Sequence, residues 1–415
     1  MHAVDKILAR ASGRKEVCAG EIVEAEVDVL MVHDRGFDLV LKALEELSVQ
    51  RVHRPESVVF VFDHSKPPLD RASALKLKTM RSFAQKNGIG TVHDIGDGIC
   101  HVLLPEKGHV WPGALMVGTD SHTTTASALG CLSAGVGKSD AAAVMATGEL
   151  WFKVPDVVKF NLSGELQEMV MARDIAQYIL GEFGTRVAQY RVAEYAGSAL
   201  EGISMDGRFS LCNLAIEMGG KTGFIEPDPR TMEYVDERGG RTNLVVKTDP
   251  EYQYSKVYNI DVSMLEPHVA CPHNPDNVKP VKDVEGVPID QASIGTCTGS
   301  RLEDLRVVAM IFKDRKVHPG VRVQVTPGSR EIYMKAASEG LVEIFLRAGV
   351  NLGMPSCFNC GLLYRAPGET SIHTGPRNFQ GRGGYEESFS YNASPATVAA
   401  SAVEGRIADP RRYVP

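Results

Sequence analysis

Short apolar runs of strand length alternate with helical stretches through the first third of the chain. Residues 58–62 and 114–117 are continuous apolar runs between polar residues, the pattern of strands that are covered on both faces. Helical periodicity occupies about 37–47 and 70–87, and a short strand is expected to begin at Thr91. Strands that alternate with helices in this way predict an α/β fold with parallel sheets.

Later segments continue the mixture of helices and strands, and a composition shift at residues 153–155 suggests a domain boundary. The length of 415 residues predicts two to three domains. We expect domains at 1–155, 156–285 and 286–415. The small, Ala/Gly-rich segment 123–150 is expected to be helical and 226–253 irregular. Further strands are expected at 156–166, 257–262 and 321–325, and further helices at about 172–182, 208–218, 302–313, 329–340 and 394–403.

Aspartate and histidine residues gather where the early strands end. Asp63 and His64 follow the first apolar run, Asp120 and His122 follow the second, and His101 comes after the short strand at Thr91. Because open α/β sheets bind ligands at the carboxyl ends of their strands, we expect these side chains to face one site. Taken singly, each histidine could instead be a buried, hydrogen-bonded residue and each aspartate a helix cap.

Charge and hydropathy exclude several functional classes. A formal net charge of −7 argues against a broad nucleic-acid surface. No apolar stretch approaches the roughly 18 residues that cross a membrane, and the charged N-terminus does not resemble a signal peptide. We therefore expect a cytoplasmic protein that binds neither membrane nor nucleic acid. Residues 135–139 (Gly-Val-Gly-Lys-Ser) resemble a phosphate loop, but Leu132 stands where that motif requires glycine.

Three of the eight cysteines have the spacing of metal ligands. Cys297 lies in the turn 295–301 (Gly-Thr-Cys-Thr-Gly-Ser-Arg), and Cys357 and Cys360 form a Cys-x-x-Cys motif. Structural zinc sites have four protein ligands, and electron-transfer clusters usually have four cysteines. A [4Fe–4S] cluster held by three cysteines leaves one iron open to act as a Lewis acid. A redox pair and a zinc site completed by a histidine remain alternatives, and the other five cysteines are expected to be buried thiols.

The motifs together resemble the aconitase and 3-isopropylmalate dehydratase family, in its separate large-subunit form, over nearly the whole chain. The matching segments are 118–123 (Gly-Thr-Asp-Ser-His-Thr), 217–219 (Glu-Met-Gly), 265–267 (Leu-Glu-Pro), 272–277 (Pro-His-Asn-Pro-Asp-Asn), the two cysteine motifs, and 377–382 (Arg-Asn-Phe-Gln-Gly-Arg). The resemblance implies a three-domain aconitase-like fold, with mixed and parallel sheets flanked by helices around a central cluster.

The resemblance also implies a function and roles for individual residues. Cys297, Cys357 and Cys360 would hold a [4Fe–4S] cluster, while Asp63, His64, His101, Asp120 and His122 would surround the open iron. Ser121, Arg377 and Arg382 would bind substrate carboxylates. The expected enzyme is a hydro-lyase that isomerises a hydroxy di- or tricarboxylic acid by stereospecific dehydration and hydration, first of all a 3-isopropylmalate dehydratase large subunit of leucine biosynthesis. Homoaconitase and methyl- or dimethylmalate-type dehydratases are the alternatives, and a non-catalytic iron–sulfur sensor is the alternative of another class.

Several positions depart from the family pattern. Gly299 stands where the turn usually reads Cys-Thr-Asn, Pro376 replaces an asparagine, and Asn259 replaces an acidic residue. The turn 33–36 (His-Asp-Arg-Gly) lacks an expected threonine, and these departures suggest an unusual substrate or altered hydrogen bonding around the cluster. The fused family members also carry a swivelling domain that this chain lacks, so we expect a small partner subunit of roughly 150 residues.

Overall fold

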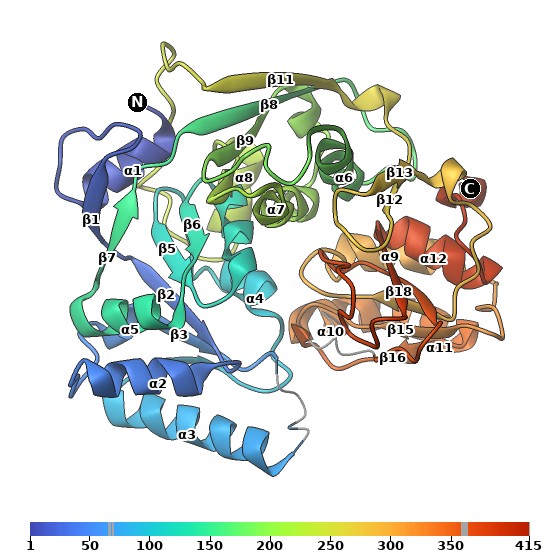
Figure 1. Ribbon diagram of the computed structural model, residues 1–415, viewed down its shortest axis with the longest axis horizontal. Coiled ribbons are helices and arrows are strands. Elements are labelled where there is room, and N and C mark those ends of the chain that lie inside the picture. The colour runs from blue at the N-terminus through green and yellow to red at the C-terminus, as the bar shows by residue number, and fades with distance from the viewer. Residues whose placement is uncertain (65–67, 69, 358–363, 415) are drawn as a thin grey trace.

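The computed structural model describes residues 1–64, 68, 70–357 and 364–414, whose strands form three larger sheets and a two-stranded ribbon (Figure 1). Helices flank each larger sheet. No helix in these described ranges is long and apolar enough to cross a membrane. The α/β architecture with mixed and parallel sheets agrees with the fold class predicted from the sequence.

The first sheet is entirely parallel and contains both apolar runs. In spatial order its strands are β4 (Thr91–His93), β3 (Val58–Val61), β2 (Val29–His33), β5 (Leu115–Gly118) and β6 (Leu132–Gly135). Every residue of β3 and β5 is buried, because helices cover both faces. One face packs against α1 (Ala3–Ala11), α2 (Phe37–Glu46), α3 (Arg71–Asn87) and α5 (Lys138–Thr147). The other face packs against α4 (Cys100–Glu106) and the 3₁₀ helix η2 (Ser121–Leu129).

The expectation for the segment 123–150 was incomplete. The segment is not wholly helical: β6 separates η2 from α5, and the small residues Leu-Ser-Ala-Gly of β6 gave no strand signal. The antiparallel ribbon pairs β1 (Ile22–Glu26) with β7 (Glu149–Lys153). A further 3₁₀ turn, η1 (Pro55–Ser57), leads into β3.

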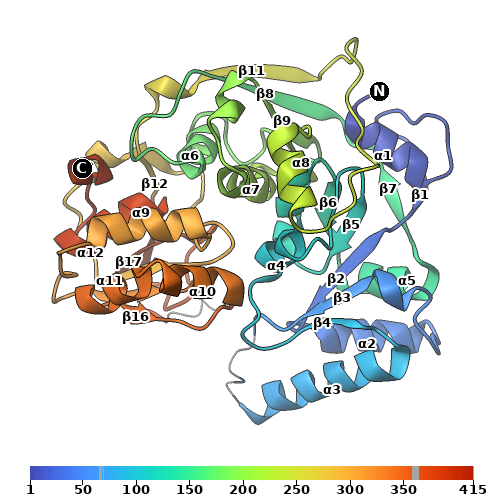
Figure 2. The same cartoon turned by 180° about the vertical axis from the view of Figure 1, so that it is seen from behind.

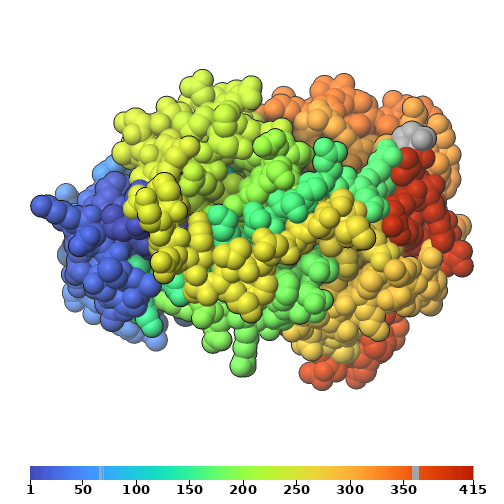
Figure 3. Space-filling view, turned by 90° about the horizontal axis from the view of Figure 1, so that it is seen from above, coloured from blue at the N-terminus to red at the C-terminus, as the bar shows by residue number. Residues whose placement is uncertain are grey.

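The second sheet is also parallel and lies across the upper face of the molecule, between the two ends of the chain (Figure 3). Its strands in spatial order are β10 (Thr222–Phe224), β9 (Val192–Ala196), β8 (Val157–Ser163) and β11 (Lys256–Asp261). Its helical elements are α6 (Ala172–Phe183), η3 (Ser198–Glu201), α7 (Met205–Leu214), η4 (Ala215–Met218), α8 (Pro229–Asp236) and η5 (Val262–Met264). The segment expected to be irregular thus contains α8, which Asp228 caps by accepting the Thr231 N–H at 2.9 Å.

The third sheet is mixed and has seven strands. They are β13 (Val278–Pro280), β12 (His268–Ala270), β18 (Phe389–Ala393), β17 (Thr370–His373), β14 (Gln291–Ile294), β15 (Arg322–Val325) and β16 (Asn351–Leu352). Its helical elements are η6 (Val281–Asp283), α9 (Leu302–Phe312), α10 (Arg330–Ser338), α11 (Leu341–Ala348), α12 (Pro395–Glu404) and η8 (Pro410–Tyr413). Figure 2 shows α9, α10 and α11 together on one side of this sheet.

Two strands of the third sheet come from before residue 286. β12 pairs antiparallel with β18, through Val269 opposite Ala393, and β13 pairs antiparallel with β12. The expected division at residue 285 therefore separates strands that share hydrogen bonds. We propose that the boundary between the second and third domains falls between β11 and β12.

Candidate active site

A pocket of about 610 Å³ lies where the carboxyl ends of strands from the first and third sheets face each other. Asp120 follows β5, His64 comes soon after β3, Cys297 follows β14, and Arg377 follows β17. The predicted site residues that line the pocket are His64, His101, Asp120, Ser121, His122, Cys297, Cys357, Arg377 and Arg382. The fold thus brings together candidates that are far apart in the sequence.

Asp63 does not line the pocket but holds His64 from behind. Its Oδ1 lies 2.7 Å from Nδ1 of His64, and its Oδ2 accepts the backbone N–H of Cys100 at 2.8 Å. Burial alone would raise the pKa of Asp63, but the charge of His64 and their hydrogen bond keep that pKa well below its usual range. Burial likewise opposes charging of His64, yet Asp63 and Asp120 raise its pKa to about 10. His64 is therefore a protonated imidazolium at the pocket wall.

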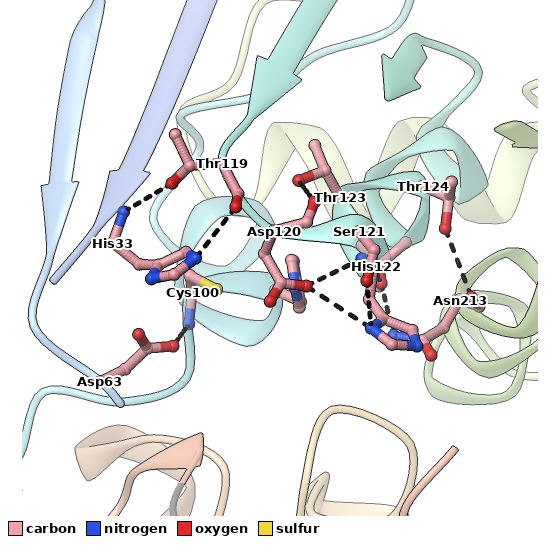
Figure 4. Close-up of polar contacts among 12 residues, drawn as sticks. His33, Asp63, Cys100, Thr119, Asp120, Ser121, His122, Thr123, Thr124 and Asn213 are labelled. Atoms are coloured by element: carbon pink, nitrogen blue, oxygen red, sulfur yellow. Dashed lines mark hydrogen bonds and ion pairs between the residues drawn. The ribbon is translucent and has the colours of Figure 1, made fainter. Parts of the chain in front are cut away.

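Asp120 is surrounded by three histidines. Its Oδ1 lies 2.8 Å from Nε2 of His101. The same oxygen accepts the backbone N–H of His122, also at 2.8 Å (Figure 4). Its Oδ2 lies 3.6 Å from Nε2 of His64. Although burial opposes ionisation, the charges and hydrogen bonds of His101 and His122 hold the pKa of Asp120 well below its usual value. A carboxylate held in this way can orient a histidine for proton transfer.

Glu217 extends this network to an arginine, although the sequence analysis did not place it in the site. Its Oε1 lies 3.0 Å from Nε2 of His122 and 2.7 Å from Nε of Arg377. Burial would raise the pKa of Glu217, but these two partners lower it. Burial also opposes protonation of His122, and Asp120 and Glu217 raise its pKa to about 9. The segment Glu217-Met218-Gly219 was noticed as a motif, but nothing local in the sequence linked its carboxylate to His122.

His33 and Asp34 support the same wall from the end of β2. The Asp34 carboxylate accepts the backbone N–H groups of Asp63 at 3.0 Å and His64 at 2.9 Å. The His33 ring stacks on His64 with centroids 4.3 Å apart. Burial, together with the charge of His64, lowers the pKa of His33 to about 3. The next residue, Arg35, is exposed and lines the pocket beside the two predicted arginines.

Two cysteines approach the pocket from separate segments. Cys297 and Cys357 are 1% and 5% exposed and both line it. The Cys357 backbone N–H donates to the carbonyl of Asp63 at 2.8 Å, which ties this segment to the first sheet. Cys360 lies outside the described residues. Thiolates are the side chains that hold iron–sulfur clusters in proteins, so the donors present at this pocket fit such a group.

The glycine that departs from the family pattern has a steric reason. A Cβ added at Gly299 would lie 2.5 Å from Cβ of Thr374. The Thr374 hydroxyl donates to the carbonyl of Gly295 at 2.6 Å, so this side chain is fixed against the cysteine turn. Pro376 is buried in the segment that follows, which places two of the departures close together. Asn259 is different, because it lies on the exposed edge strand β11, where it accepts a hydrogen bond from the side chain of Asn161 on β8. It is not among the described residues that line the pocket.

The fold and the pocket define an α/β protein with a polar, thiol-lined site between two sheets. The aconitase family (aconitate hydratase) model matches residues 5–286 and 277–405, and the chain belongs to this family. It is similar to the probable 3-isopropylmalate dehydratase large subunit of Methanothermobacter thermautotrophicus, with 48% identity over 99% of each chain. It is 45% identical to the 3-isopropylmalate dehydratase large subunit of Aquifex aeolicus, covering 100% of this chain and 98% of that one.

Two further similarities widen the comparison. The probable methanogen homoaconitase large subunit of Methanothermobacter thermautotrophicus is 44% identical over 99% of this chain and 98% of its own. The crystal structure of Thermococcus kodakaraensis aconitase X in its holo form superposes with a TM-score of 0.51 at 13% identity, covering 90% of this chain and 89% of that one. At that identity, the likeness concerns the fold alone.

Proposed function

We propose that the chain is the large subunit of a 3-isopropylmalate dehydratase, a hydro-lyase that isomerises its hydroxy acid by dehydration and rehydration. The observation that carries this proposal is the convergence of Cys297 and Cys357 with Asp120 and its histidines in one pocket. Relatives that carry this name match the chain over nearly its full length.

Three cysteines would hold the cofactor in this proposal. Cys297 and Cys357 are two of them, and Cys360 is the third by resemblance to the family. A bound [4Fe–4S] cluster would supply a Lewis acid for the substrate hydroxyl. The remaining tasks, which are substrate binding and proton transfer, belong to protein side chains.

The substrate carboxylates would bind to the arginines. Arg377 and Arg382 line the pocket, and a planar guanidinium matches the geometry of a carboxylate. Arg377 is fixed by Glu217 at 2.7 Å, and its Nη2 donates to the Ser121 hydroxyl at 3.3 Å. These contacts orient the guanidinium before the substrate arrives.

Proton transfer to the leaving hydroxyl would fall to His101, which Asp120 orients. In dehydration the carbon–oxygen bond breaks, and the oxygen leaves as water after taking this proton. A base removes the proton from the neighbouring carbon, and the electron pair of the broken carbon–hydrogen bond forms the double bond. Rehydration in the opposite regiochemistry completes the isomerisation. We propose that a small partner subunit supplies that base and closes the pocket, as the name "large subunit" of the relatives suggests.

A homoaconitase large subunit is the second candidate, and Arg35 is the observation that favours it. Arg35 gives the pocket a third arginine, which would suit a third carboxylate better than an isopropyl group. One of the full-length relatives carries the homoaconitase name.

Anaerobic reconstitution with iron and sulfide, followed by addition of the small subunit, tests both candidates. We expect hydration of 2-isopropylmaleate to exceed that of homoaconitate and of methyl- or dimethylmaleate. A preference for homoaconitate would favour the second candidate. A chain that takes up iron but leaves every acid unchanged with its partner present would be a sensor and not an enzyme.

A further inference from the structure

Arg173 is a buried cation in an electrostatically unfavourable place. It lies in the first turn of α6 and is 2% exposed. A positive charge near a helix N-terminus is repelled by the helix dipole, and burial of a charge costs free energy unless the charge is paired. Burial lowers the pKa of Arg173 to about 10, so the guanidinium remains charged at neutral pH. Hydrogen bonds or negative charge near Arg173 must therefore offset the free-energy cost of burying its charge.

Its guanidinium joins two segments of the third domain that lie far apart in the sequence. Nη1 donates to the Thr298 hydroxyl at 2.9 Å and to the Thr374 carbonyl at 2.5 Å, while Nη2 donates to the Gly375 carbonyl at 2.7 Å. Thr298 follows Cys297 directly, and Gly375 comes two residues before Arg377. One side chain from the second domain therefore bridges the cysteine turn and the segment that presents the substrate-binding arginine.

The acceptors of these hydrogen bonds carry no charge. The carboxylate next in sequence, Asp174, favours the charged form of Arg173 through its own charge, but its hydrogen bonds go elsewhere, because it accepts the backbone N–H groups of Met171 at 2.8 Å and His268 at 2.9 Å. Within the described part of the chain, no carboxylate forms an ion pair with Arg173, and its Nε has no hydrogen-bond partner. Arg208, another fully buried arginine of the second domain, differs because it pairs with Asp228 at 2.6 Å.

We propose that Arg173 is a positioning residue that holds the cysteine turn and the Arg377 segment at a fixed separation, with its charge balanced in part by cluster thiolates. The positioning role rests on the three hydrogen bonds alone. The charge balance rests on the proposed function, because thiolates are present only where the cysteines hold a metal group.

Two substitutions separate the two roles. Arg173→Lys keeps the positive charge but cannot form the three-way bridge, whereas Arg173→Met removes both. Arg208→Lys and Arg208→Met are matched controls, since they alter an equally buried arginine remote from the pocket. All four variants are made in the full-length chain, and circular dichroism verifies that each is folded.

Hydrogen exchange of the cluster-free chain tests the positioning role without any cofactor. We expect the backbone N–H groups of residues 295–301 and of residues 374, 375, 377 and 378 to exchange about 10-fold faster or more in both Arg173 variants, because neither variant can form the bridge that joins the two segments. The Arg208 variants should leave both segments at their wild-type rates. Wild-type exchange rates in both segments of Arg173→Met would overturn the positioning role.

Iron retention of the reconstituted chain tests the charge balance. We expect a chelator to remove iron from Arg173→Met about 10- to 100-fold faster than from wild type, with Arg173→Lys in between. With the partner subunit present, Arg173→Lys should raise KM more than it lowers kcat, because Arg377 is less well placed. Arg173→Met that keeps its iron as long as wild type overturns the charge balance. A wild-type chain that binds no iron while both segments still respond to Arg173→Met refutes the cluster proposal and supports the positioning role.

Discussion

Nε2 of His122 lies 3.0 Å from Oε1 of Glu217, and the same oxygen lies 2.7 Å from Nε of Arg377. One buried carboxylate therefore fixes both a histidine beside Asp120 and an arginine that we propose binds the substrate. Its loss disturbs two functions at once.

Glu217→Gln should lower kcat/KM of the reconstituted enzyme by roughly 10- to 100-fold, since hydrogen bonds to charged groups contribute about 1.5–3 kcal/mol. Steady-state kinetics with the partner subunit measures this change. Glu194→Gln is the control, because Glu194 lies 2.7 Å from Nε2 of buried His2 and is remote from the pocket. If both variants lost the same activity, the effect would reflect stability and not the site.

Cys297→Ser and Cys357→Ser should each abolish assembly of a stable cluster, because the thiolate is the ligand and a serine hydroxyl loses its proton far less readily than a thiol. Iron content and visible absorbance after anaerobic reconstitution measure the loss. Cys360→Ser is expected to behave in the same way by the family resemblance. Cys131→Ser is the control, because Cys131 is fully buried in the core and donates to the Ala126 carbonyl. An intact cluster in Cys297→Ser would refute that assignment.

Gly299→Asn, which restores the residue expected for the family, should destabilise this chain. The new Cβ would overlap with Thr374, and overpacking of this kind costs about 1–3 kcal/mol. Thermal unfolding of the cluster-free chain measures the change. Gly368→Asn is a control with a similar change at a glycine whose added Cβ would meet no atom within 4 Å, although its φ of +80° carries its own strain. An unchanged Tm for Gly299→Asn would show that Thr374 can move aside.

Asp304 should make the chain less stable as the pH rises. Burial, together with the charges of Asp206 and Glu303, raises the pKa of Asp304 to about 7, from a usual value of 3.8, although Arg301 partly opposes the shift. The folded chain thus holds this proton more tightly than the unfolded chain. The favourable contribution is complete below about pH 4 and disappears as the pH rises through about 7.

Asp304→Asn should therefore gain stability relative to wild type at pH 8, by at most about 4 kcal/mol, and gain little at pH 4. Urea unfolding at the two pH values measures the difference. The amide oxygen of asparagine can still accept the Arg301 backbone N–H, which Asp304 accepts at 2.9 Å. A stability difference that does not depend on pH would contradict the shifted pKa.

The sequence predicted the elements whose signals are local. The apolar runs of β3 and β5 and the polar residues that follow them identified both strands and the Asp/His wall of the pocket. β6 was missed because its small residues resemble a helical segment, and α8 was missed within a charged stretch. The spacing of the cysteines marked Cys297, Cys357 and Cys360 as candidate ligands, and the first two line the pocket.

Residues that act through distant partners gave no such signal. Arg173 is one arginine among many in the sequence. Only the fold brings it into contact with its partner Thr298, which lies 125 residues away along the chain. Glu217 was visible as part of a motif, but its pairing with His122 spans 95 residues. Contacts of this kind depend on how three sheets pack together, which hydrophobic periodicity does not encode.

The third sheet contains strands from both the middle and the end of the chain, which affects how the protein can be divided into fragments. A fragment that begins at residue 286 would lack β12, and the edge of β18 that pairs with Val269 and Ala270 would be exposed. Unpaired strand edges promote aggregation. Recombinant expression of the C-terminal part should therefore start before His268, and a truncation that starts at 286 should yield mostly insoluble material.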